Sequence, residues 1–249
     1  MKKNIFWRLL SVLTVLMIVS EMRAEEPKSQ SQKTYTSSTS FSLLITSGNA
    51  RELTFGFDTE QSLIVKKNQF QLKGSVIYGR SDGIKNAEFY YSHLKYKREM
   101  TSKVFLLALS RFEKNILAGY SYRYSLSAGA GYIWAKKTKI TATSEASLGW
   151  SHESNIGQDS AILSFMSLLV ASSVKVVLTP TAHISCQEIF SLNLKDPKDF
   201  RVTSFISVTA DLNKSLAFKF SYQLFYNHKS IPGFKNTDHY LLSSLVLNL

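Results

Sequence analysis

Between Leu216 and Leu249, two runs of residues alternate in side-chain character with a period of two. In the first run, one parity carries only large apolar or aromatic residues: Leu216, Phe218, Phe220, Tyr222, Leu224 and Tyr226. In the second run, one parity carries Leu241, Leu245, Leu247 and Leu249, interrupted only by Ser243. A period of two places the two sets on opposite faces of a β-strand. The stretch therefore predicts two strands, joined by a polar loop, that each have one apolar face.

The apolar face of such a sheet must be covered, and the chain after its first residues contains no pattern that predicts a covering helix. Similar alternating runs follow one another from Thr39 to the end, and they predict about twelve strands of roughly ten residues. Hydrophobic residues make up 44% of the chain and its mean hydropathy is −0.07, which is too polar for a helical membrane protein. The fold class predicted is all-β: a transmembrane antiparallel β-barrel, apolar outside and polar within.

The chain divides into three predicted parts. Residues 1–24 have the features of a secretory signal peptide, with Lys2 and Lys3 before an apolar core that runs from Leu9 to Val19. Residues 25–38 are rich in Ser, Lys, Gln and Thr, which predicts a flexible lead-in. Residues 39–249 form the predicted barrel.

The connections between the predicted strands alternate in length. One set is short and often basic, as at Lys66-Lys67-Asn68 and Asn213-Lys214-Ser215. The other set is mostly longer: Gly79 to Asn86, Glu113 to Ser121, Ser151 to Asp159 and Asn227 to Asp238. Short periplasmic turns and longer extracellular loops are typical of bacterial outer-membrane barrels, so both barrel termini are expected at the periplasmic side.

The charge and cysteine content exclude several classes of protein. The formal net charge is +12, but the basic residues are scattered among turns and strand ends, so we expect no nucleic-acid partner; anionic lipid headgroups are a suitable counter-charge. The single cysteine, Cys186, excludes an intrachain disulfide. The five histidines show no ligand spacing, so neither a metal nor another cofactor is expected.

Four segments, in order along the chain, resemble a known family: Leu43 to Asn49 (LLITSGN), Val76 to Gly83 (VIYGRSDG), Tyr122 to Tyr132 (YRYSLSAGAGY) and the closing stretch from Lys235 to Leu249. They are similar to the domain-of-unknown-function 481 family of YdiY-type salt-induced outer-membrane proteins. The resemblance implies an outer-membrane barrel without a defined biochemical role. Such barrels usually end on an aromatic residue that the assembly machinery reads through the C-terminal strand, whereas this sequence ends on Leu249.

Several charged residues share the polar parity of their strands and are predicted to line the lumen: Glu52, Asp58, Lys73, Arg123, Glu145 and Lys219. Two interpretations are open. Ion pairs between these side chains could plug the lumen, as the narrow bore of about twelve strands favours. Alternatively, they could line a small pore and select solutes by charge.

One local pattern suggests a different chemistry. His152 and Ser154 share a parity, so the imidazole could act as a base for the serine hydroxyl, and Asn155 follows. The pattern is similar to the His-x-Ser-Asn signature of outer-membrane phospholipase A and of lipid A deacylases. In those enzymes a residue of the neighbouring strand holds the histidine; the spacing puts Met166 at that position, and Asp159 is only a loose substitute.

The sequence therefore predicts a non-enzymatic barrel of the bacterial outer membrane, structural or passively permeable, with membrane lipid and the assembly machinery as its partners. The alternative is an outer-membrane lipid esterase that uses His152 and Ser154. A third hypothesis, a surface-loop binder, rests on the basic loop from His228 to Lys235.

Overall fold

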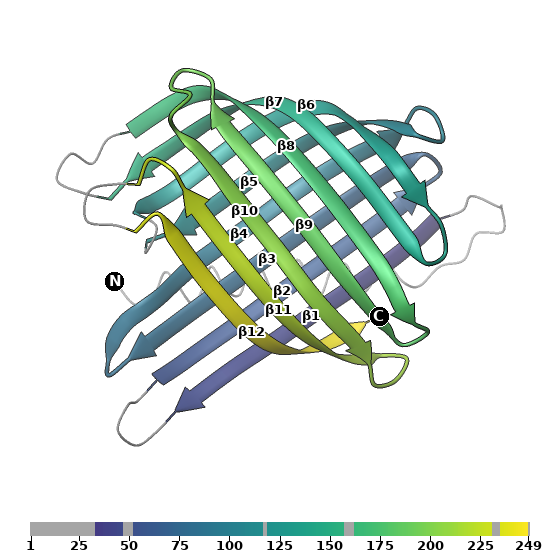
Figure 1. Cartoon of the computed structure of the whole chain (residues 1–249), viewed down its shortest axis with the longest axis horizontal. Helices are drawn as coiled ribbons and strands as arrows, with labels where there is room; N and C mark the ends of the chain where they lie inside the picture. The colour runs from purple at the N-terminus through teal and green to yellow at the C-terminus, as the bar shows by residue number, and fades with distance from the viewer. Residues whose placement is uncertain (1–32, 47–51, 117–118, 157–161, 231–234, 249) are drawn as a thin grey trace. The chain divides into compact units, whose positions relative to one another are not determined.

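Twelve antiparallel β-strands make up the computed structural model, which describes residues 33–46, 52–116, 119–156, 162–230 and 235–248 (Figure 1). The strands are β1 (Lys33–Thr46), β2 (Glu52–Val65), β3 (Asn68–Ser81), β4 (Ile84–Glu99), β5 (Val104–Asn115), β6 (Tyr120–Lys136), β7 (Ile140–Asn155), β8 (Ile162–Thr179), β9 (Ala182–Asn193), β10 (Phe200–Asp211), β11 (Leu216–Asn227) and β12 (Thr237–Asn248). The described residues contain no helix that is long and apolar enough to cross a membrane.

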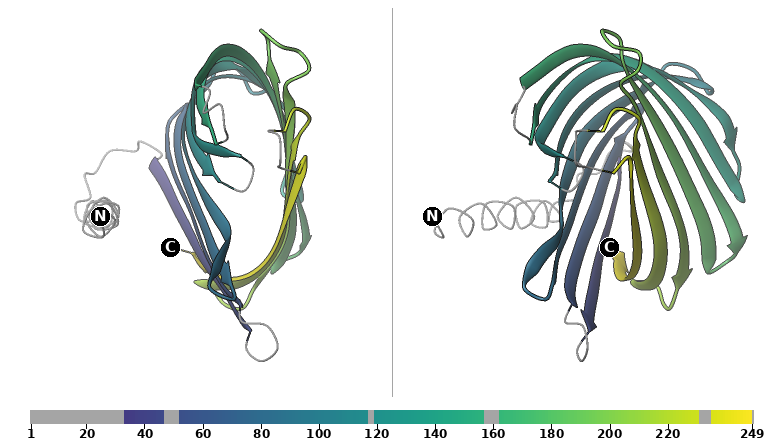
Figure 2. Two further views of the ribbon diagram at one scale, coloured as in Figure 1. Left: turned by 90° about the vertical axis from the view of Figure 1, so that its left-hand side faces the viewer. Right: turned by 60° about the vertical axis from the view of Figure 1, so that its left-hand side comes forward.

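Each strand pairs with its neighbours in sequence, and β1 pairs with β12, so the sheet closes into a barrel (Figure 2). This confirms the predicted fold class and strand number. Two-residue connections such as Lys66-Lys67 and Pro180-Thr181 lie at the end of the barrel where β1 begins and β12 ends. The other end carries longer connections such as residues 194–199 and 228–236, which marks it as the extracellular end.

The two faces of the wall follow the alternation of the sequence. On β11, Phe220 is 44% exposed and points outward, whereas Gln223, three residues later, is 7% exposed and points inward. On β12, Leu241 and Leu245 are exposed while Ser244 is buried. An apolar face turned outward is stable only against lipid.

The strands are longer than predicted, from 12 residues in β5 to 18 in β8. β1 begins at Lys33, so residues 33–38 belong to the barrel wall and not to the lead-in; residues 1–32, with the predicted signal peptide, lie outside the described part. The connector predicted from Gly79 to Asn86 is also wrong. It is a two-residue turn, Asp82-Gly83, with φ of 49° and 80°, the left-handed conformations that an Asp-Gly hairpin requires.

The seam that closes the barrel is much shorter than the other ladders. β1 and β2 pair over fourteen residues, whereas the described parts of β1 and β12 pair over four: Ser38 to Phe41 against Asn248 to Leu245. These pairs lie at the periplasmic end of β12, so the rest of β12 has a neighbour only on the β11 side.

Strand β5 departs from the apolar-out, polar-in pattern. The inward face of β5 carries Phe105, Leu107 and Leu109, all buried. Phe105 packs against Gly131 of β6, where an added Cβ would lie 2.1 Å from the ring. The apolar residues of both parities on β5 are thus explained by packing inside the barrel.

Candidate functional site: the barrel lumen

A cavity of about 830 Å³ occupies the periplasmic part of the lumen. Its wall includes Asp58 of β2, Lys73 of β3, Glu145 of β7 and Lys219 of β11, four of the residues that the sequence predicts to line the lumen. Arg123 lines a smaller cavity near the extracellular end. Glu52 is the first residue of β2 and pairs with Thr46, but its side chain lies outside the described part. A role of these residues in selecting solutes stays a prediction.

Most of the charges of the large cavity are paired. The Nζ of Lys95 lies 2.6 Å from Glu145 Oε2, and the Nζ of Lys97 lies 3.8 Å from Glu145 Oε1. Lys73 Nζ contacts Glu60 Oε2 at 3.0 Å. Because β4 and β7 are not adjacent strands, the contact from Lys95 to Glu145 spans the concave inner surface of the wall.

Two small cavities continue from the large one toward the extracellular end, with volumes of about 20 and 40 Å³. The first shares five wall residues with the large cavity: Tyr91, His93, Lys95, Glu145 and Gln187. The second shares three wall residues with the first: Arg111, Leu169 and Ile189. The three cavities therefore lie in series along the barrel and are separated by side chains, not by backbone.

A buried ion-pair network borders the outermost cavity. Glu153 of β7 is 1% exposed and receives two hydrogen bonds from Arg201 of β10, each of 3.0 Å, and one of 2.8 Å from Arg123 Nε of β6. Arg123 and Arg201 also contact Glu113 and Asp199, at 3.6 and 3.3 Å. The network joins β5, β6, β7 and β10 across the outer part of the lumen and narrows it.

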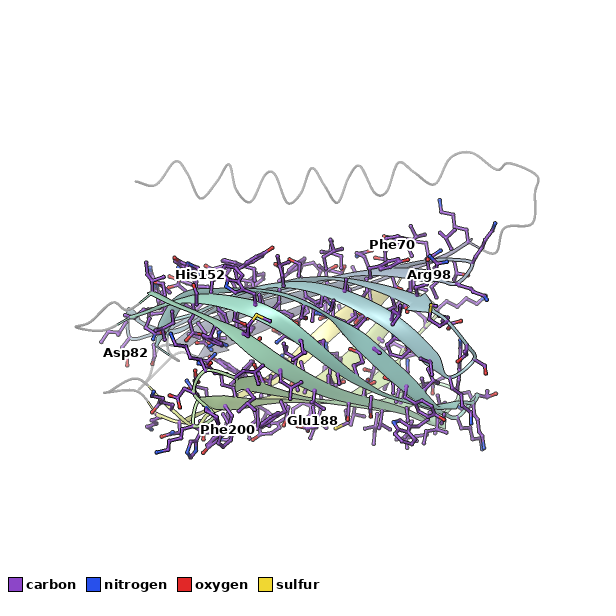
Figure 3. The ribbon with its side chains drawn as sticks, turned by 90° about the horizontal axis from the view of Figure 1, so that it is seen from above. Phe70, Asp82, Arg98, His152, Glu188 and Phe200 are labelled. Atoms are coloured by element: carbon purple, nitrogen blue, oxygen red, sulfur yellow. The ribbon has the colours of Figure 1, made fainter. Side chains whose placement is uncertain are left out.

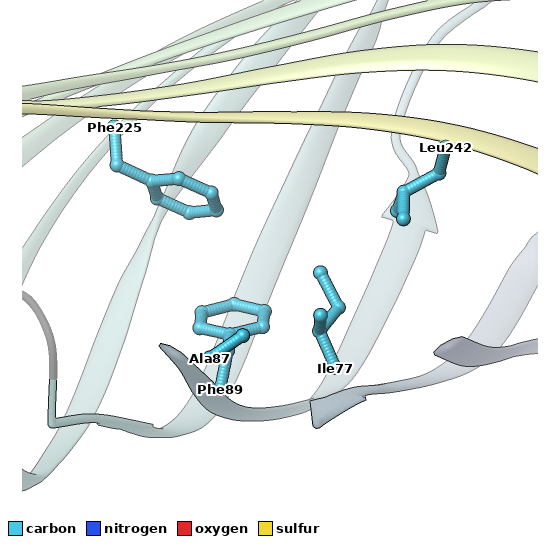
Figure 4. Packing of buried hydrophobic residues seen from close by; sticks show 5 residues of the cluster. All are labelled: Ile77, Ala87, Phe89, Phe225 and Leu242. Carbon is cyan, nitrogen blue, oxygen red and sulfur yellow. The ribbon is translucent and has the colours of Figure 1, made fainter. Parts of the chain in front are cut away.

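An apolar bridge closes the other side of the outer lumen. Phe225 of β11 and Leu242 of β12 reach across the lumen toward Ile77 of β3 and toward Ala87 and Phe89 of β4 (Figure 4). The rings of Phe89 and Phe225 lie 5.2 Å apart between centroids. We call these five residues the aromatic bridge, and the side chains of Tyr91, Phe205 and Tyr240 pack against it.

The predicted esterase residues do not form a catalytic pair in the structure. His152 lies on the outer face of β7, where it stacks on Trp150 (Figure 3). Its Nδ1 contacts Ser164 Oγ of β8 at 2.7 Å, and Ser154 is not among its hydrogen-bond partners in the described part of the chain. The prediction that Met166 stands beside His152 is wrong, because the ladder pairs Met166 with Trp150 and Ser164 with His152. Asn155 ends β7, and residues 157–161, with Asp159, lie outside the described part.

Sequence analysis missed Glu153 and Arg201, the centre of the ion-pair network. Glu153 follows His152 and has the opposite parity, so it points inward. This parity could have identified it as a lumen residue, but the sequence predicts a loop from Ser151 to Asp159. The aromatic bridge was missed for a different reason. Its residues stand on inward parities where a polar lining was expected, and only the register of distant strands brings them together.

The described residues contain no group of three or more His, Cys, Asp or Glu side chains that could hold a metal ion. Cys186, on β9, is a free thiol that lies 3.8 Å from Glu188 Oε1.

Comparison with known proteins identifies the family. The family model described as "Protein of unknown function, DUF481" matches residues 39–248. The chain belongs to the DUF481 family. This confirms the resemblance drawn from the sequence. The DUF481 chain has no match among curated proteins.

Three solved structures resemble this DUF481 barrel in fold. An outer membrane channel from Pseudomonas putida F1 aligns with a TM-score of 0.50 and 9% identity, over 90% of this chain and 100% of that one. The NanC porin aligns with a TM-score of 0.47 and 7% identity, over 86% and 98%. The translocator domain of the autotransporter NalP from Neisseria meningitidis aligns with a TM-score of 0.44 and 9% identity, over 97% of this chain and 95% of that one. These likenesses concern the fold. The closed barrel with its apolar outer face is an outer-membrane protein of bacteria.

Proposed function

We propose that the protein is a narrow passive pore for small polar solutes, with no enzymatic activity. The observation that carries this proposal is the series of three cavities, which runs from the periplasmic end to the loops between β11 and β12. A barrel with a purely structural role needs no cavity of about 830 Å³ lined by charged side chains. The constrictions between the cavities keep the conductance low.

The wall of the large cavity supports a weak preference for anions. It carries five lysines, Lys73, Lys95, Lys97, Lys175 and Lys219, against four acidic residues, Asp58, Glu60, Glu145 and Asp211. Among the described residues, Lys175 and Lys219 form no ion pair, and neither do Asp58 and Asp211, so the preference rests on the excess of one lysine in the wall. Rings of charged side chains determine ion selectivity in pores of this kind.

Conductance in a planar bilayer tests the proposal. The double variant Lys95→Ala/Glu145→Ala removes the ion pair between the two inner cavities, so we expect a severalfold larger single-channel conductance than in the wild type. The matched control is Lys136→Ala/Glu99→Ala, which removes an exposed ion pair of 3.0 Å at the periplasmic end and leaves the lumen unchanged. Absence of channels in the wild type and in both folded variants would instead support a structural barrel.

Lipid hydrolysis is the competing activity, and a simple assay separates it from the pore. Purified protein is incubated with phospholipid and lipopolysaccharide micelles, and released fatty acid is measured. We expect none above a detergent blank, since His152 has Ser164 and not Ser154 as its partner. Release that both His152→Ala and Ser154→Ala abolish would make the protein an esterase.

A further inference from the structure

In the described residues, the seam between β1 and β12 covers only the last four of the twelve residues of β12. In the same register, Ser42 would face Ser244 and Thr46 would face Tyr240, but the ladder ends at the pair Phe41–Leu245. The extracellular ends of the two strands diverge, with the start of β12 well apart from the arrowhead of β1 (Figures 1 and 2). The outer half of the seam therefore has two strand edges without a ladder between them.

Such edges are unusual within a membrane. Backbone N–H and C=O groups in hydrocarbon must be hydrogen-bonded, which is why membrane barrels normally close along their full height. The outer face of this seam is nevertheless apolar, because Leu43 and Leu241 are 63% and 65% exposed on either side of it. The gap thus lies in the part of the wall that contacts lipid.

The lumen behind the gap is apolar as well. Leu242 points inward from β12 and lies over Gly56 of β2, where an added Cβ would be 4.0 Å from Leu242 Cδ2. Gly56 pairs with Ser42, so Leu242 covers the inner side of the seam. Leu242 is also a member of the aromatic bridge, together with Phe89 and Phe225 (Figure 4). A molecule entering through the seam at the level of Leu242 would meet the hydrocarbon and aromatic rings of the bridge.

We propose that the outer half of the β1–β12 seam is a lateral opening, through which an apolar molecule dissolved in the outer leaflet reaches the aromatic bridge. A single hydrocarbon chain, as in a free fatty acid, has the right chemistry, since a polar solute would gain nothing from the bridge. The route needs no continuous aqueous path through the lumen. The lateral opening can therefore exist whether or not the lumen conducts ions.

The test combines a buried reporter with a reversible lock. In a background of Cys186→Ser, Trp134→Phe and Trp150→Phe, the substitution Phe225→Trp places one tryptophan in the aromatic bridge of the mature protein. Ser42→Cys with Ser244→Cys allows a disulfide at the first position beyond the ladder, which holds the two diverging edges together. The matched control pair, Ser40→Cys with Val246→Cys, joins residues that already face each other in the ladder. Each protein is placed in phospholipid vesicles and titrated with a dibrominated stearate, whose bromines quench tryptophan at contact.

We expect strong quenching in the reduced proteins, a severalfold loss of quenching when the 42–244 disulfide forms, and recovery on reduction. The oxidised control pair should quench as before. Equal quenching with the seam locked, or no quenching when it is free, would overturn the proposal. Hydrogen exchange in vesicles covers the case in which no disulfide forms: amides of residues 241–244 should exchange faster than those of residues 245–248, and equal protection would contradict an open seam.

Discussion

Two adjacent residues of β11 show how the environment alternates along a strand. Phe220 faces lipid and Lys219 faces the large cavity. Phe220→Arg puts a charge near the middle of the bilayer and should lower the free energy of unfolding by about 2–4 kcal/mol. Lys219→Gln should change it little, because the side chain stays in a polar cavity. Urea unfolding in lipid vesicles measures both; a larger loss for Lys219→Gln would mean that the strand register is shifted by one residue.

We expect the substitution of Glu153 to lower the free energy of unfolding strongly. It is buried between Arg123 and Arg201, so Glu153→Ala leaves two guanidinium groups short of a partner. Breaking a buried ion pair in this way costs about 3–5 kcal/mol. Glu99→Ala is the control, because the exposed pair with Lys136 is worth at most about 1 kcal/mol. If unfolding measurements gave equal losses for both variants, the network would be hydrated and could not narrow the lumen.

At the scale of elements, a contact between two extracellular loops links β9–β10 to β11–β12. Lys229 Nζ donates a hydrogen bond of 2.6 Å to Asp196 Oδ2. This hydrogen bond lowers the pKa of the Asp196 carboxyl and raises the pKa of Lys229. For the carboxyl, the contact is fully present above the ordinary aspartate pKa of about 3.9 and is lost only as the pH falls through the lowered value.

The titration of the Asp196 carboxyl can be monitored by NMR of its carboxylate carbon. We expect its midpoint to lie at a lower pH than that of an ordinary aspartate. Lys229→Gln should return the midpoint to the ordinary value. An unchanged midpoint in that variant would mean that the two loops do not make the contact in solution.

The elements also show what the sequence could predict. For β11, the sequence predicted both the strand and which face points to lipid, because Phe220 and Lys219 have opposite parity and opposite polarity. The faces of β5 could not be predicted, because Phe105 and Leu107, which pair with glycines of β6, face inward and remove the contrast between the two faces. The ion-pair network lay beyond prediction for another reason. Arg123 and Arg201 stand 30 and 48 residues from Glu153, and only the register of intervening strands brings them together.

For the whole molecule, the described chain is strand and turn throughout. Circular dichroism of the mature protein in detergent should therefore show β-structure and almost no helix, and the folded protein should migrate differently from the boiled protein in electrophoresis. A large helical signal in a preparation that shows this heat-dependent shift would contradict the architecture.

The short seam also determines the order in which the barrel can form. Every other ladder joins strands that follow each other in sequence, so those hairpins can form locally. The four β1–β12 pairs instead join segments that lie about 200 residues apart. Forming these pairs closes a long loop of chain and therefore costs conformational entropy that the local hairpins do not lose. Non-local pairings form late and slowly, because that entropy is lost before the contacts compensate for it. Closure is therefore the last folding step, and until it occurs the protein is an open twelve-stranded sheet with two free edges that must be kept from pairing with other chains.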